Sequence, residues 1–114
     1  MAGSNVWLKS GKVYNMFSGS GVTTTATGNG IYKDSPYSTF QATVTGSGAV
    51  TATVAIDCSN DGTNWCSTSL GTITLSGTTS NADGFVTSAP WKYVRARVTA
   101  ISGTGATVQV LMGV

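Results

Sequence analysis

The side chains most able to do chemistry lie in one segment near the middle of the chain. It runs from Asp57 to Cys66 and reads Asp-Cys-Ser-Asn-Asp-Gly-Thr-Asn-Trp-Cys. Oxygen-bearing side chains at alternate positions before a glycine are typical of a calcium loop. Two cysteines on either side of a turn are typical of a disulfide or of part of a zinc site. The segment therefore raises the hypotheses of a metal site, a disulfide and a plain turn.

The pattern of ligands argues against a metal. A helix-loop-helix calcium site needs a bidentate glutamate at its twelfth position, which here is Thr68, and the chain has no glutamate. Two cysteines without any histidine would leave a tetrahedral zinc site half filled. We expect no metal and no cofactor, with a looser site on Asp57 and Asp61 as the alternative. The preferred interpretation is a turn in which Gly62 takes the left-handed conformation behind Asn60 and Asp61.

The same turn leaves two alternatives for the cysteines. A three-residue loop places Ser59 opposite Thr63 and Cys66 opposite Ile56, so that the two sulfurs are offset. A shift that places Cys58 opposite Cys66 would permit a cross-strand disulfide. Two free, largely buried thiols and a disulfide therefore both stay open. A nucleophilic thiol is not expected, because the chain has no histidine to activate one.

Composition argues against several classes of function. Without histidine or glutamate, acid-base catalysis would depend on four aspartates, the lysines and the tyrosines. No glycine-rich run leads into Lys-Ser or Lys-Thr, as it would in a phosphate-binding loop. We therefore expect that the protein is not an enzyme. The net charge of +2 is too small to indicate nucleic-acid binding. No apolar run approaches the roughly 20 residues of a membrane helix. Arg95 and Arg97 share one strand face, which is either solvated or an interface with an acidic partner.

The elements that position these residues are predicted to be strands. Threonine, valine and glycine are abundant and helix-forming residues are scarce, which indicates an all-β protein. Apolar and polar residues alternate over residues 39–45, 50–58, 93–101 and 106–112, with glycine-rich turns at 46–48 and 102–105 and a polar loop at 78–84. We expect about eight to ten short strands in one antiparallel sandwich. Residues 21–114 would form it, and residues 1–20 are either an arm or its first strands.

Aromatic residues provide the remaining candidate sites. Trp65 and Trp91 flank turns, and we expect them to plug the ends of the core rather than to stack on sugars. Apolar residues near the N-terminus lie among glycine and serine, where aromatic side chains favour contact with a partner chain. The candidate contact residues are Trp7, Leu8, Tyr14, Phe17, Arg95 and Arg97.

Several short motifs stand out in the C-terminal part of the chain. They are Ser59-Asn60-Asp61-Gly62-Thr63-Asn64-Trp65, Leu70-Gly71-Thr72-Ile73-Thr74-Leu75, Asp83-Gly84-Phe85 and Ala89-Pro90-Trp91-Lys92-Tyr93-Val94-Arg95, followed by the block from Tyr93 to the end. Together they resemble a recurring group of small structural proteins of tailed bacteriophages. The Ser-x-Asp-Gly-x-x-Trp turn is also similar to one in discoidin-like, carbohydrate-binding sandwiches.

The phage resemblance implies a jelly-roll-like β-sandwich that serves as a capsid decoration or cement protein. Its partners would be the major capsid protein, at the junctions between subunits, and further copies of itself. It would be made in the host cytoplasm and reside on the capsid surface of the virion. The alternatives are a head-tail connector, a tail-fibre-associated protein, or a carbohydrate-binding module.

Overall fold

The computed structural model describes residues 13–17, 19 and 21–114. These residues form six strands and no helix. The strands are β1 (Val13–Asn15), β2 (Ala26–Thr27), β3 (Ile31–Tyr32), β4 (Ser38–Ser59), β5 (Gly71–Thr87) and β6 (Tyr93–Gly113). They make one open antiparallel sheet in the order β1-β6-β4-β5, and β2 and β3 also pair with β6. The prediction of an all-β, antiparallel protein is confirmed.

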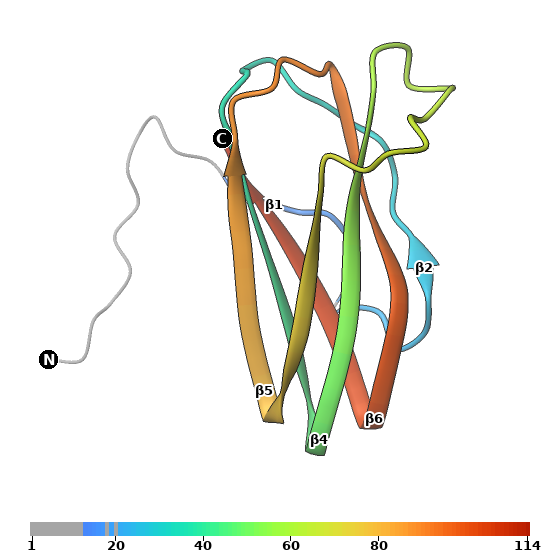
Figure 1. The fold of residues 1–114 in the computed structure, drawn as a ribbon, viewed down its shortest axis with the longest axis vertical. Helices are drawn as coiled ribbons and strands as arrows, with labels where there is room; N and C mark the ends of the chain where they lie inside the picture. The colour runs from blue at the N-terminus through green and yellow to red at the C-terminus, as the bar shows by residue number, and fades with distance from the viewer. Residues whose placement is uncertain (1–12, 18, 20) are drawn as a thin grey trace, which may run out of the picture.

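Each of the three long strands bends sharply in its middle and runs back, as Figure 1 shows at the lower end of the molecule. The β4 bend lies at residues 46–48, where the pairing of β4 with β5 shifts register between Thr45 and Ala49. Gly48, Gly103 and Thr79 take positive φ angles of 80°, 123° and 66° at the three bends. Glycine adopts this conformation at little cost, which explains the glycine-rich sequence at two of the bends. We call this end of the sheet the bend end.

The two halves of the bent sheet enclose the core between them. The residues that alternate in the sequence point inward, and Phe40, Val54, Val98 and Val110 are all at most 1% exposed. Within β5, a Cβ atom added to Gly71 would lie only 2.5 Å from the ring of Phe85, on the returning half of the same strand. The predicted inward faces of residues 39–45, 50–58, 93–101 and 106–112 are therefore confirmed.

The described residues form six strands, fewer and longer than the eight to ten short strands that were predicted. Turn residues at 46–48 and 102–105 bend continuous strands instead of separating short ones, because neighbouring strands bend at the same level and keep their pairing. Residues 78–84, expected to be a polar loop, belong to β5 for the same reason: residues 80–84 pair with residues 41–45 in the first half of β4, before its bend. A jelly-roll arrangement of separate sheets is not confirmed.

The N-terminal residues that the structure describes belong to the folded body. Val13, Tyr14 and Asn15 pair with the end of β6, and Met16 donates a backbone hydrogen bond to Val110. Met16 and Phe17 are 4% and 5% exposed and join the core. Residues 13–17 are thus the first strand and its continuation, whereas residues 1–12 lie outside the described part of the chain.

Candidate functional site

One candidate binding surface is a groove lined by tyrosines at the end of the sheet opposite the bends. This end, which we call the loop end, carries the connections at residues 33–37, 60–70 and 88–92. The groove has a volume of about 250 Å³, and its walls include Tyr14, Ile31, Tyr32 and Val114. Tyr32 is 59% exposed there. A groove of this size fits one or two side chains of a partner better than a cofactor.

Strand pairing places Tyr14 and Tyr32 beside the groove. Tyr14 lies opposite Met112 on β6, and Met112 in turn lies opposite the core residue Phe40 on β4. These three residues therefore form one row across neighbouring strands, and Tyr14 is the exposed residue at its end. Tyr32 lies opposite Tyr93, with the ring centroids 5.4 Å apart and the planes at 72°. This edge-to-face contact is a favourable aromatic geometry. Both exposed rings are therefore held by the sheet rather than by a free loop.

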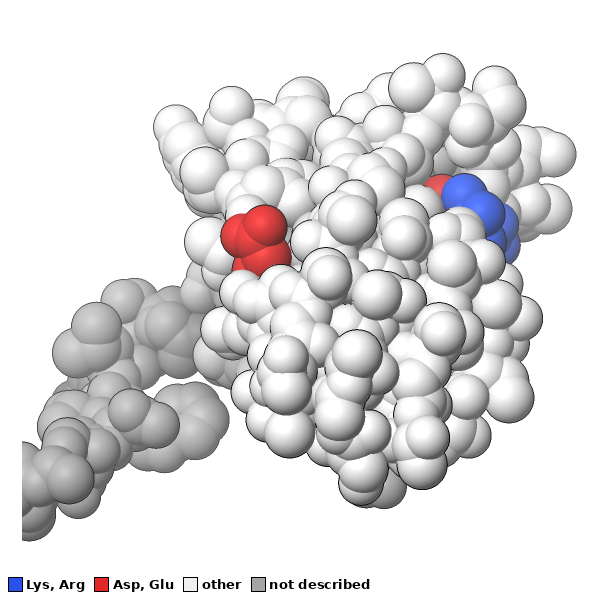
Figure 2. Space-filling model, turned by 60° about the horizontal axis from the view of Figure 1, so that its bottom comes forward, with Lys and Arg blue, Asp and Glu red and all other residues white. Residues whose placement is uncertain are grey.

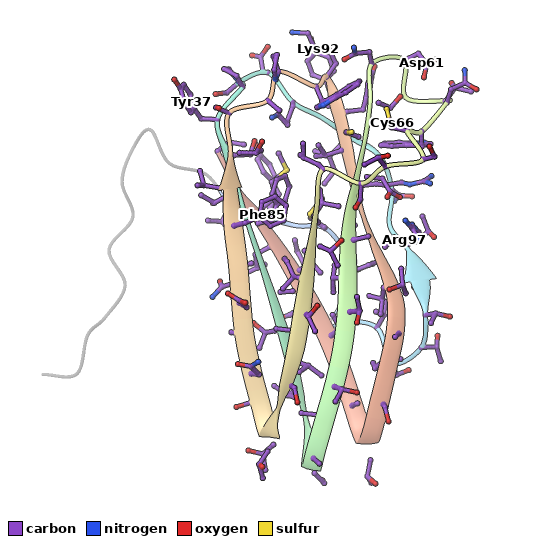
Figure 3. All side chains as sticks on the ribbon, in the orientation of Figure 1. Tyr37, Asp61, Cys66, Phe85, Lys92 and Arg97 are labelled. Carbon is purple, nitrogen blue, oxygen red and sulfur yellow. The ribbon has the colours of Figure 1, made fainter. Side chains whose placement is uncertain are left out.

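A buried lysine fixes the loops behind the groove. Lys33 is 2% exposed, and its Nζ donates to the carbonyl oxygens of Pro36 and Ala89, both at 2.9 Å. Burial, followed by the nearby charge of Lys92, lowers the pKa of Lys33. The lysine thus ties together two loops that lie far apart in the sequence. Tyr37, a third exposed tyrosine at this end, is 68% exposed and stands on the first of these loops (Figure 3).

Arg95 and Arg97 converge on a buried carboxylate. Asp57 is 2% exposed; its Oδ2 accepts hydrogen bonds from Nε of Arg95 at 3.0 Å and Nε of Arg97 at 2.9 Å. Nη2 of Arg97 also donates to Asp57 Oδ1 at 3.0 Å, which makes the pair bidentate. Burial alone would raise the pKa of Asp57, but the hydrogen bonds and charges of Arg97 and Arg95 outweigh it and hold this pKa below its usual value.

This cluster changes the interpretation of three residues. Asp57 belongs to β4 and not to the turn, and it lies opposite Arg95 across the sheet. Arg95 also stacks over the ring of Trp65, with its Cζ 4.4 Å from the ring centroid. One face of Trp65 is therefore covered by a charged side chain. Trp65 and Trp91 are partly buried, and neither belongs to the main core cluster.

The turn after β4 is organised by a second carboxylate. Asp61 Oδ1 accepts the backbone N–H of Thr63 at 2.9 Å and of Asn64 at 2.8 Å, and its Oδ2 accepts the side-chain amide of Asn64. The Asn64 side chain, these backbone donors and Ser59 hold the pKa of Asp61 well below its usual value. Gly62 has a φ of +73°, as predicted. Asp61 thus uses its oxygens to close its own turn.

The loop is longer than the expected three residues, and this changes the cysteine register. The backbone N–H of Cys66 donates to the carbonyl of Cys58 at 3.0 Å, and Leu70 donates to Ile56. Of the two registers left open by the sequence, the structure has the one in which Cys66 returns beside Cys58 and not beside Ile56. The extra residues are accommodated by the hydrogen bonds that Asp61 and Ser59 make inside the loop. Both cysteines are free thiols.

The residues proposed from the sequence do not gather at one place. Tyr14 lines the groove, whereas Phe17 is buried in the core and has little surface to offer a partner. Arg95 and Arg97 lie on β6 and pair with Asp57 on the neighbouring strand β4. Trp7 and Leu8 lie outside the described residues.

Tyr32, Tyr37 and Val114 were not singled out from the sequence. The available signal was the pair of tyrosines flanking the Asp34-Ser35-Pro36 turn. Sequence pattern alone gave no means of telling that this turn meets the end of β6. The groove forms where these two distant segments come together.

Two further observations concern possible ligands. Among residues 13–17, 19 and 21–114, no group of three or more His, Cys, Asp or Glu side chains is placed to hold a metal ion. In the same part of the chain, no helix has the length and apolar character needed to cross a membrane.

Comparisons with known proteins identify a shared fold and no family. No family model matches the chain, and no curated protein matches it in sequence. Among solved structures, the SPBc2 prophage-derived protein YomS has a similar fold, with a TM-score of 0.55. The similarity covers 96% of this chain and 100% of YomS, at 11% sequence identity. The fold described above is therefore one that the chain of a prophage-derived protein also adopts.

Proposed function

We propose that this protein is a non-enzymatic structural protein of a bacteriophage virion that decorates the capsid and binds where major capsid proteins meet. The observation that carries the proposal is the fold shared with the prophage-derived protein YomS over the whole length of that chain. A fold alone does not determine a function, so the remaining support has to come from the surface.

The tyrosine groove has the chemistry of a protein-binding surface. Tyrosine is enriched among the residues that contribute most to binding energy, because a large and rigid ring loses little entropy on contact. Tyr32 in the groove and Tyr37 on the adjoining loop are 59% and 68% exposed, and Val114 on the groove wall is 39% exposed. The tethered loops behind the groove keep these side chains at fixed positions before a partner arrives. Such preorganisation lowers the entropy cost of binding.

The distribution of charge suits a subunit packed closely against others. Residues 40–56 and 98–114 contain no charged side chain. Figure 2 shows the result: apart from two small groups, the face toward the bend end is free of lysine, arginine and acidic residues. Protein interfaces are depleted of charge at their centres, since burying an unpaired charge is costly. Neighbouring copies of this protein or of the capsid protein can therefore pack here at low desolvation cost.

The carbohydrate-binding alternative gains no comparable support. Trp65, which follows the discoidin-like turn, has one ring face occupied by Arg95. Sugar stacking needs an open aromatic face.

Decoration of isolated heads tests the proposal. Fluorescently labelled protein is mixed with DNA-filled heads of the phage that encodes it, and bound protein is measured after sedimentation. We expect Tyr32→Ala combined with Tyr37→Ala to weaken binding at least tenfold, since each removes an aromatic anchor. The matched control is Val86→Ala, which shortens a side chain that is 71% exposed on β5, outside the groove. Binding of wild-type protein to tails alone would instead indicate a connector or fibre role.

A further inference from the structure

The two cysteines lie where a disulfide would join the loop to the strand. Cys58 is 3% exposed near the end of β4, and Cys66 is partly exposed on the returning loop. The hydrogen bond from the backbone N–H of Cys66 to the carbonyl of Cys58 is 3.0 Å long. Antiparallel residues that exchange both backbone hydrogen bonds have Cα atoms about 5.5 Å apart, which is near the most common spacing for a disulfide. Cys58 and Cys66 share one of these two bonds, which brings their backbones into the range that a disulfide can span.

The two thiols also influence each other. The pKa of Cys58 is raised to about 11, first by burial, then by hydrogen bonding with and charge from Cys66, and last by the charge of Asp57. Both side chains also border the same hollow in the surface.

The loop between the cysteines is held in place without a covalent link. Ser59 Oγ donates to the carbonyl of Asn64 at 2.7 Å, and Asp61 accepts from two backbone N–H groups within the same loop. These hydrogen bonds already fix the path by which the loop returns to β4. Attack of Cys58 on a mixed disulfide at Cys66 would therefore be an intramolecular reaction, in which the effective concentration of the Cys58 thiol is high.

An oxidant can reach the pair from outside. Cys58 and Cys66 line an open hollow of about 530 Å³ together with Leu70 and Trp91. Cys66 is the more exposed of the two thiols. A small disulfide such as oxidised glutathione therefore has access to Cys66 first, and Cys58 lies behind it.

From this geometry we propose that Cys58 and Cys66 form an intramolecular disulfide when the protein meets a small-molecule disulfide in an oxidising environment. The Cys66 thiolate attacks one sulfur of oxidised glutathione and releases one reduced glutathione. Cys58 then loses its proton and attacks the Cys66 sulfur of the mixed disulfide, which releases the second glutathione. One protein disulfide and two glutathione thiols result. The bond fastens the Asp61 loop to β4, and it does not depend on the proposed capsid role.

Intact-mass spectrometry of the native protein incubated with oxidised glutathione tests the inference. We expect a loss of two hydrogen atoms, disappearance of both free thiols, and a peptide that links Cys58 to Cys66. The single variants Cys58→Ser and Cys66→Ser serve as controls that cannot close the bond. Stable glutathione adducts on the wild-type protein, or dimers joined by cysteine, would overturn the proposal.

Thermal unfolding supplies a second readout. Closing so short a loop in its native geometry should raise the melting temperature by an amount on the order of 10 °C. Dithiothreitol should remove this increase in the wild-type protein and have no effect on Cys66→Ser. An unchanged or lower melting temperature after oxidation would mean that the bond distorts the loop, which would contradict the inferred geometry.

Discussion

Replacing Asp57 by asparagine should destabilise the protein substantially at neutral pH. The carboxylate accepts three hydrogen bonds from two arginines and is 2% exposed. Each hydrogen bond to a charged group contributes about 1.5–3 kcal/mol. The side chains of Arg95 and Arg97 remain 26% and 38% exposed, so water solvates them once the carboxylate is gone. We therefore expect a loss of about 2–3 kcal/mol rather than the full sum.

Urea unfolding at several pH values measures this contribution. At pH 7 the midpoint should fall by about 1–2 M urea with an unchanged slope. Because the pKa of Asp57 is lower in the folded than in the unfolded protein, its contribution is complete above the unfolded value of about 4. It is lost as the pH falls through the folded pKa. The difference between wild type and Asp57→Asn should therefore shrink in acid.

The control is Asp34→Asn, which alters an exposed carboxylate at the loop end. This variant should change the free energy of unfolding by no more than about 0.5 kcal/mol. Equal stability of Asp57→Asn and wild type at pH 7 would refute the assignment of Asp57 as a stabilising centre. A difference that stayed constant down to pH 2 would show that geometry rather than charge is responsible.

Three further changes test the packing. Lys33→Met should lower the free energy of unfolding, measured with a chemical denaturant, by about 2–4 kcal/mol, because the carbonyl groups of Pro36 and Ala89 lose their hydrogen-bond donor. A variant as stable as the wild type would contradict the proposed role of Lys33 in joining the two loops. Gly71→Ala should lower stability by about 1–3 kcal/mol, because the added methyl group meets the ring of Phe85, whereas an unchanged melting temperature would disprove that contact. Removal of residues 1–17 should destabilise the protein, because it deletes β1 and two core side chains.

The sequence was most informative about which residues face the core. Alternation over residues 39–45 and 50–58 identified the inward positions correctly, since a strand has a side-chain period of two whatever its length. The same alternation contains no information on whether a glycine-rich interruption ends a strand or bends it. That outcome at residues 46–48 depends on β5 and β6 bending at the same level, which is a property of the whole sheet. Strand number was therefore the part least accessible to prediction.

The candidate sites show the same division between local and distant information. The turn at Gly62 is encoded locally and was predicted. The pairing of Asp57 with Arg97 joins residues 40 positions apart, and the sequence offered no means of finding it. The groove needed Tyr14 and Tyr32 to meet Val114 at the end of β6. Surfaces assembled from distant segments become visible only once the order of the strands is known.

The central claim, that this is a capsid-bound virion protein, is tested most directly by locating it in purified particles of the phage that encodes it. Gold-labelled antibody against the protein, viewed by electron microscopy, should decorate the outer surface of the heads in many copies per particle. Heads that lack the protein should bind it again when it is added back. Label confined to tails, or absence of the protein from particles by mass spectrometry, would contradict the claim.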